Sequence, residues 1–359
     1  MKGRTVQVPA EAVQTGAAER KDPIRKQIRA SSLLLSGRVF AIGVNFLTQV
    51  LIVRYLSQMD FGAFAYALAV VAFFQSGSSL GLRTAIPRFV PIFHEKKDYP
   101  KLLGTIALGL ITAILTSLVI VGTTLLAPRV ISRLMGGGQP ATVLLMVMIF
   151  VVPMEALDDV LMGTFASFHQ PRTILTRRHL LGPLIKLLAI GLIMALKGSA
   201  VLLAFSYVLG SAVGVAIYLP ILLRLLRKEN ILEPHWMRSM EIPAGKLFRF
   251  SLPLLMSDLL IGLAPLVSVV ILDHYYSLGE VALFRAVVPF AAVNRIVRVN
   301  FETLYAPTAA RLYALRDFSR MNEQYWRTAA WVAALTFPVF AATFCVRSEE
   351  RRVGKECRL

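Results

Sequence analysis

The chain has 359 residues, of which 56% are hydrophobic and 17% are charged, and its formal net charge is +18. A soluble domain is about 45–50% apolar and about 25% charged, so this composition excludes an ordinary soluble protein. The positive residues lie between long apolar runs, as the positive-inside rule predicts for a membrane protein. The charge therefore does not indicate a nucleic-acid partner.

The N-terminal residues 1–30 are polar and basic, and they contain no apolar stretch of the kind found in a secretory signal. We expect them to form a basic cytoplasmic arm. The two cysteines and five histidines show neither a disulfide framework nor metal-ligand spacing. The sequence also lacks the phosphate-binding GxxxxGK[ST] motif. We therefore predict no catalytic residue, no cofactor and no metal site.

Apolar segments follow the arm and predict nine membrane-spanning helices, because about 20 apolar residues suffice to cross a bilayer. The fold class expected is therefore an all-α polytopic membrane protein. The predicted segments are Ser31–Tyr55, Phe61–Leu82, Leu102–Ala127, Ala141–Ala166, Leu180–Leu196, Ala200–Leu223, Phe250–Leu272, Val281–Tyr305 and Ala329–Val346.

The links between these segments alternate in basic charge. One link carries Arg83, Arg88 and Lys101 among other basic residues, whereas the later link DHYYSLGE has no lysine or arginine. Basic links face the cytoplasm in most membrane proteins. The alternation predicts a cytoplasmic N-terminus.

The sequence also repeats itself at an offset of 220 residues. The stretch YLSQMDFGAFAYA from Tyr55 aligns with YYSLGEVALFRAV from Tyr275. The pairs that match or are similar are Tyr55 with Tyr275, Ser57 with Ser277, Asp60 with Glu280, Phe64 with Phe284 and Pro87 with Pro307. Six segments separate the copies, so both have the same orientation, which is the parallel repeat found in secondary transporters.

The repeat predicts two lobes of six helices in the full-length protein. We expect a first lobe over 31–226, a cytoplasmic linker over 227–249 and an incomplete second lobe over 250–346. The charged stretch RSEERRVGKECRL, 347–359, interrupts the ninth segment and resembles the translation of a common sequencing adapter. We expect it to be an artefact, with the natural second lobe continuing beyond residue 346.

Polar side chains inside the first two segments are candidates for substrate binding, since such residues are costly in a membrane. Arg38, Asn45 and Gln49 fall on one face of the first helix. Gln75 lies in the inner half of the second helix. The alternatives are that Arg38 extends to the lipid headgroups and that Gln75 bonds a neighbouring helix.

Arg285 and Arg295 interrupt the eighth segment and are further substrate-binding candidates. Arginines can neutralise phosphate with paired N–H donors. The alternative is that both residues anchor the helix at the membrane interface.

Acidic residues within the spans are candidates for coupling transport to a cation or proton gradient. These are Glu155, Asp158 and Asp159 in the fourth segment and Asp258 in the seventh. They are equally suited to act as counter-ions for Lys186, Arg38 or the loop arginines.

The stretch LIVRYLSQMDFGAFAYALAVVAFFQSGSSLGLRTAIPRF resembles the first hairpin of O-antigen-type polysaccharide flippases, members of the multidrug/oligosaccharidyl-lipid/polysaccharide (MOP) exporter superfamily. That group has a "YLS…(D/E)FG.Y" turn followed by a span that ends in "GL..A..R". Gly81, Leu82, Ala85 and Arg88 occupy the latter positions.

The second copy also resembles the start of the family's second lobe, through FSLPLLMSDLLIG and ILDHYYSLGEVALFRA. The resemblance covers Arg25 to Val346. Arg285 departs from the pattern, because these proteins usually carry an aromatic or small residue near that position.

The resemblance implies two six-helix lobes around a central cavity, and a cargo of lipid-linked oligosaccharide carried on a polyprenyl pyrophosphate. It implies a multi-pass protein of the cell's inner (plasma) membrane, surrounded by membrane lipids and driven by Na⁺ or H⁺. Glycosyltransferases and a glycan polymerase of polysaccharide or lipopolysaccharide synthesis are the implied partners. The alternatives are a cation-coupled multidrug exporter of the same superfamily, a membrane glycan polymerase or ligase, and a scaffold without transport activity.

Overall fold

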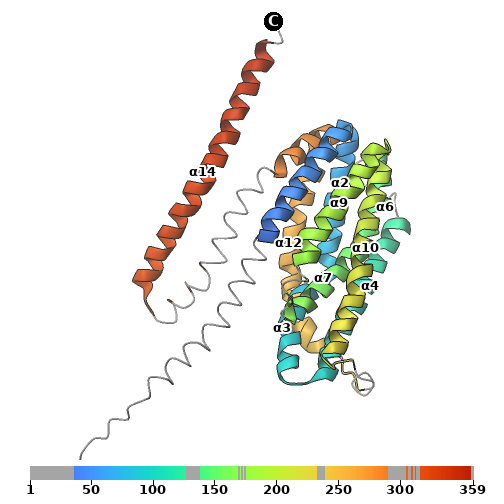
Figure 1. Cartoon of the computed structure of the whole chain (residues 1–359). Helices are drawn as coiled ribbons and strands as arrows, with labels where there is room; N and C mark the ends of the chain where they lie inside the picture. Colours follow the sequence, from blue (N-terminus) through green and yellow to red (C-terminus); the bar gives the residue numbers. More distant parts are fainter. Residues whose placement is uncertain are drawn as a thin grey trace, which may run out of the picture. The chain divides into compact units, whose positions relative to one another are not determined.

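The computed structural model describes residues 36–126, 138–168, 170, 173, 175–232, 239–289, 305, 309, 312 and 316–356. They belong to two compact units, Met1–Leu283 and Phe284–Leu359. The described helices of the first unit form a bundle (Figure 1). They are Ser36–Tyr55, α2 (Gln58–Ser78), α3 (Leu82–Glu95), α4 (Tyr99–Leu126), α6 (Gly138–Met148), α7 (Val151–Ser167), the π-helix η1 (Leu175–Leu181), α9 (Gly182–Ala195), α10 (Ala200–Lys228) and α12 (Ala244–Tyr275). A further helix covers 278–289, and α14 (Phe318–Glu356) lies in the second unit.

The described part of the chain is all-helical, which confirms the predicted fold class. It has six helices long and apolar enough to cross a membrane, or seven if α6 and α7 form one bent span. These agree with the first seven predicted segments. Most of the eighth, 290–304, lies outside the described residues, and the ninth falls within α14. The count of nine, the cytoplasmic N-terminus and the lobe boundaries stay predictions.

The N-terminus of α2 is formed by the first copy of the repeated turn. The Ser57 side chain accepts a hydrogen bond from the Asp60 amide at 3.1 Å, which satisfies one of the free N–H groups of the first turn. Asp60 also places negative charge at the positive end of the helix dipole. Before this turn, the Tyr55 hydroxyl donates to the Gly198 carbonyl at 2.7 Å. The turn is therefore tied to the link between α9 and α10.

α6 and α7 meet at an angle of 43°. Pro153 lies in the first turn of α7 and has no N–H to donate to a preceding carbonyl, so the helical hydrogen-bond ladder is interrupted there. The bend directs α7 across the bundle, where it packs against α3, α4 and α10. Its carboxylates thereby lie inside the first unit.

α12 packs along α2 and α3. Close approach depends on small residues, as is usual between membrane helices. A Cβ added to Gly262 would collide with the Ser76 side chain, and one added to Gly81 would collide with the Ser251 carbonyl. Gly81 also has a φ of +74°, a conformation that glycine adopts without strain. It permits the chain to break between α2 and α3.

A hydrophobic core joins α3, α4, α7 and α10. Its fully buried members include Ile86, Leu102, Phe165 and Leu222. Phe165 packs edge-on against Tyr218 with ring centroids 6.2 Å apart. This core holds α7 in place beside α10.

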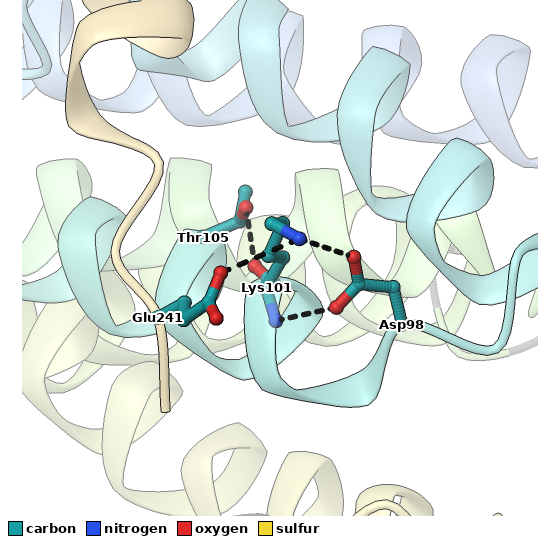
Figure 2. Close-up of polar contacts among 4 residues, drawn as sticks. All are labelled: Asp98, Lys101, Thr105 and Glu241. Atoms are coloured by element: carbon teal, nitrogen blue, oxygen red, sulfur yellow. Dashed lines mark hydrogen bonds and ion pairs between the residues drawn. The ribbon is translucent and has the colours of Figure 1, made fainter. Parts of the chain in front are cut away.

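The segment before α12 crosses the start of α4, as Figure 2 shows. Lys101 Nζ donates to Asp98 Oδ2 at 2.7 Å and lies 3.3 Å from Glu241 Oε2. The Glu241 amide donates to the Pro100 carbonyl at 3.3 Å. A Cβ on Gly104 would collide with the Glu241 carbonyl, so the crossing needs a glycine there. These contacts attach the beginning of α12 to α4.

The two copies of the sequence repeat touch each other. A Cβ on Gly62 would collide with the Leu278 carbonyl, and Gln58 Nε2 donates to the Gly279 carbonyl at 3.2 Å. Gly62 is buried and its repeat equivalent, Ala282, is 3% exposed, so both copies present a small residue here. The contact, which we call the repeat seam, closes this end of the bundle between α2 and the helix over 278–289.

Candidate functional site

A polar cavity of about 200 Å³ lies within the first unit. Its lining comes from the helix Ser36–Tyr55, α2, α3, α7, η1, α9 and α10. The lining residues are Asn45, Gln75, Arg83, Glu155, Asp158, Asp159, Met162, Arg177, Arg178, Gly182, Pro183, Lys186, Gly210 and Ser211. Such a concentration of ionisable groups between apolar helices marks a functional site in a membrane protein.

The most enclosed contact in the cavity is the ion pair of Arg177 with Asp158. Arg177 Nε lies 3.0 Å from Asp158 Oδ1, and the two side chains are 8% and 16% exposed. The guanidinium carbon of Arg177 also lies 5.7 Å from the centre of the Tyr218 ring. A Cβ on Gly214 would collide with the guanidinium, so glycine provides the space for it.

The π-helix η1 brings Arg177 into the cavity. Its sequence LTRRHLL runs directly into Gly182 and Pro183, the first residues of α9. Proline is favoured at the start of an α-helix because its missing N–H is not needed there. π-helical turns are rare and occur frequently at functional sites.

Glu155 contacts two groups on other helices. Its Oε1 accepts from Ser211 Oγ at 3.0 Å and lies 3.9 Å from Lys186 Nζ. The Lys186 ammonium is also 5.4 Å from the centre of the Tyr207 ring. A hydrogen bond, a long ion pair and a cation–π contact therefore join α7, α9 and α10.

A third ion pair connects α3 with α12. Arg83 Nη2 lies 3.4 Å from Asp258 Oδ1, with side chains 50% and 14% exposed. In contrast, the side chains of Asp159 and Arg178, which also line the cavity, make no hydrogen bond or ion pair with any residue that the structure describes.

Some of the residues predicted to form the site line the polar cavity, and others do not. Asn45 and Gln75 line the cavity. Arg38 is exposed and Gln49 is half-buried on the same helix as Asn45, but neither belongs to the lining.

The remaining predicted residues divide in a similar way. Glu155 and Asp158 line the cavity. Asp258 is not part of the lining, but it forms an ion pair with the lining residue Arg83. Arg285 belongs to the second unit, and Arg295 lies outside the described residues.

Sequence reasoning missed Arg177 and Arg178 as members of the site, although it named Asp159 beside Asp158 as a coupling candidate. Both arginines lie in the basic link before the predicted span Leu180–Leu196, because hydropathy begins that span only after them. One sequence feature could have indicated these arginines. They lie just before Gly182 and Pro183, where α9 begins, and η1 runs into α9 without a break, so both arginines lie on the same continuous helical segment as the span.

An apolar groove of about 400 Å³ lies on the opposite side of α2 from Gln75. It is lined by Phe73, Phe74, Gly77, Leu80, Leu115, Thr116, Val119, Ile120 and Leu259. The hydroxyl of Thr116 donates to the Ser78 and Thr112 carbonyls within the bundle. The groove is thus almost free of polar groups and suits hydrocarbon.

A bundle of helices long and apolar enough to cross a membrane, around a charged cavity, is the architecture of a multi-pass membrane protein. The chain belongs to the family described as "Polysaccharide biosynthesis protein", whose model matches residues 28–305. No sequence among curated proteins is significantly similar to the chain.

Solved structures of transporters share the fold. A multidrug resistance MATE family transporter of the MOP superfamily, in an inward-facing conformation, is 16% identical, with a TM-score of 0.63 over 87% of this chain and 71% of that one. The MATE multidrug transporter DinF-BH is 13% identical, with a TM-score of 0.60 over 95% of this chain and 75% of that one. An outward-facing MATE family structure has a TM-score of 0.51 at 16% identity, over 88% of this chain and 71% of that one. The chain therefore belongs to the polysaccharide biosynthesis family and shares the fold of these MATE family structures.

Proposed function

We propose that the protein flips a polyprenyl-pyrophosphate-linked oligosaccharide from the cytoplasmic to the outer leaflet of the plasma membrane, for polysaccharide export. The observation that carries this proposal is the polar cavity inside a bundle of membrane spans, in a member of a polysaccharide biosynthesis family. A lipid-linked glycan keeps its apolar chain in the bilayer, but its sugars and pyrophosphate need polar groups throughout the passage. Glycosyltransferases supply this cargo on the cytoplasmic side, and a glycan polymerase consumes it outside.

Transport follows an alternating-access cycle. The basic links predict a cytoplasmic N-terminus, and with that orientation the repeat seam at Gly62 and Leu278 faces outwards. The seam brings the two repeats together and closes that side. Opening it would let the cargo leave outwards, as expected for lobes that rock around a fixed site.

The cycle draws its free energy from a Na⁺ or H⁺ gradient. Glu155, Asp158 and Asp258 are the coupling groups, and each lies within 4 Å of a side-chain cation. The driving ion would compete with Lys186, Arg177 and Arg83 for these carboxylates. Such competition couples the ion to the contacts between helices.

A disulfide across the repeat seam tests the proposal in cells. Gln58 Nε2 donates to the Gly279 carbonyl across the seam at 3.2 Å, and a Cβ added at position 279 would meet only side-chain atoms, with Gln58 Cδ 3.7 Å away. We expect Gln58→Cys with Gly279→Cys to lose export of surface polysaccharide under oxidation and to regain it with a reductant. The strain must lack its own flippase, and each single cysteine variant serves as the matched control.

Export that continues in cells whose seam is fully cross-linked would contradict the alternating-access proposal. The second candidate function, a multidrug exporter, is favoured by the carboxylate Asp159, which has no side-chain cation in contact among the described residues. It predicts resistance to cationic drugs in the same strain, with no gain of surface polysaccharide.

A further inference from the structure

The charges of the polar cavity are balanced. Its lining contains four cations, and they are matched by three lining carboxylates together with Asp258, which faces Arg83. Three of the cations, Arg83, Lys186 and Arg177, already contact carboxylates at 3.4, 3.9 and 3.0 Å. A pyrophosphate group would find no excess of positive charge in this cavity, and would have to displace carboxylates that are held in place.

Four other side chains of the cavity lining have no hydrogen-bond or ion-pair partner among the described residues. Asp159, Arg178, Asn45 and Gln75 make no side-chain hydrogen bond or ion pair with the part of the chain that the structure describes. Asp159 only accepts hydrogen bonds, Arg178 only donates them, and the two amides do both. They come from α7, η1, the helix Ser36–Tyr55 and α2, so they enclose the cavity from different sides.

A sugar ring matches this set of groups. Each hydroxyl both donates and accepts, so one ring can satisfy a carboxylate, a guanidinium and two amides together. The volume of about 200 Å³ equals that of about six or seven waters at about 30 Å³ each, the scale of one sugar ring. None of the described lining residues is aromatic, so the cavity offers no ring on which a planar drug cation could stack.

We propose that this cavity recognises one uncharged sugar of the cargo, with Asp159 and Arg178 as the principal contacts and Asn45 and Gln75 completing them. The proposal rests on the proposed function, since it names the part of the lipid-linked glycan that the first unit binds. The pyrophosphate is held elsewhere in the protein. Binding of the sugar therefore sets which glycans are exported.

The test compares two lipids that share one polyprenyl chain, a pyrophosphate without sugar and a pyrophosphate bearing a single uncharged sugar. Their affinities for the purified protein in nanodiscs are measured by thermophoresis. The wild type should bind the sugar-bearing lipid more tightly. Asp159→Asn and Arg178→Gln should each weaken that binding about tenfold or more, because each removes a charge-assisted hydrogen bond, and should leave the sugar-free lipid unaffected.

Asp98→Asn is the matched control, because this carboxylate lies outside the cavity and pairs with Lys101. It should change neither affinity. Asn45→Ala removes an exposed amide and should weaken only the sugar-bearing lipid, which keeps the test decisive if the charge variants do not fold.

Two results would overturn the sugar assignment while leaving the proposed function standing. One is equal weakening of both lipids in Asp159→Asn and Arg178→Gln, which would place the pyrophosphate in the cavity. The other is a wild type that binds both lipids equally well. A wild type that binds neither lipid would instead refute the flippase itself, and the assignment with it.

Discussion

The buried ion pair of Arg177 with Asp158 yields the sharpest stability prediction. Asp158→Ala leaves a guanidinium that is 8% exposed with its nearest charge partner, 3.0 Å away, removed. Breaking a buried pair in this way costs about 3–5 kcal/mol, which lowers the equilibrium constant for folding about a hundredfold or more. The Gly214 backbone packs against the guanidinium, so the arginine has little room to turn towards water.

The assay is equilibrium unfolding in detergent micelles, followed by circular dichroism of the helices. Asp98→Ala is the control, because the side chains of Asp98 and Lys101 are partly exposed, at 28% and 33%. Its free energy of unfolding should fall by only a small fraction of the loss expected for Asp158→Ala. The double variant Arg177→Met with Asp158→Leu should recover most of the loss, since a well-packed apolar pair often replaces a buried ion pair without cost. An Asp158→Ala loss no larger than that of Asp98→Ala would refute the reasoning.

Three further predictions concern contacts outside the cavity. Gly62→Val should lower the free energy of unfolding by about 1–3 kcal/mol, because a larger side chain collides with the Leu278 carbonyl; unchanged unfolding would show that the repeat seam is not closed. Gly104→Ala should cost a similar amount at the crossing before α12, measured by the same unfolding assay, and a neutral result would remove that crossing from the fold. The hydrogen bond from Lys101 lowers the pKa of Asp98 below its usual 3.8, so the pair stabilises the fold above that pH and loses its contribution as pH falls through the lowered pKa. Unfolding temperatures of the wild type and Asp98→Asn should converge as pH falls below the lowered pKa of Asp98, and a constant difference at all pH values would contradict the pairing.

Hydropathy predicted the spans because a segment can cross lipid only if its own residues are mostly apolar and its own backbone hydrogen bonds are satisfied. This requirement can be assessed from the sequence of each segment alone. The predicted Ala200–Leu223 lies within α10, which begins at the same residue and ends at Lys228. The repeated turn was also visible in the sequence, through Ser57 and its counterpart Ser277. The structure adds that Ser57 caps α2.

The composition of the cavity was beyond sequence reasoning because ion pairs join residues that are distant in the chain. Asp158 was predicted as a coupling group, but nothing in its neighbourhood indicated Arg177 as its partner, 19 residues later. Arg38, Asn45 and Gln49 share a helical face in the sequence, yet only Asn45 lines the cavity. That helix packs against η1, where a Cβ added to Gly37 would collide with the Leu175 side chain. Its rotation follows from this packing, which its own periodicity does not describe.

Contact between the repeats was also not predictable from their alignment. The offset of 220 residues predicts that the two turns have the same orientation in the membrane, but it does not predict the distance between them. The approach depends on Gly62 and Ala282, which occupy equivalent positions and are both small. Small residues are common in apolar segments, so they carry no signal until a partner is placed against them.

The most direct test of the central claim measures movement of the cargo between leaflets. The protein is reconstituted in liposomes with a polyprenyl-pyrophosphate glycan, and a membrane-impermeant glycosidase reports which glycans face outwards. We predict that glycans initially protected inside become accessible in vesicles that contain the protein, and that Asp159→Asn slows this exchange. Equal accessibility in vesicles with and without the protein, when a Na⁺ or H⁺ gradient is supplied, would contradict the account.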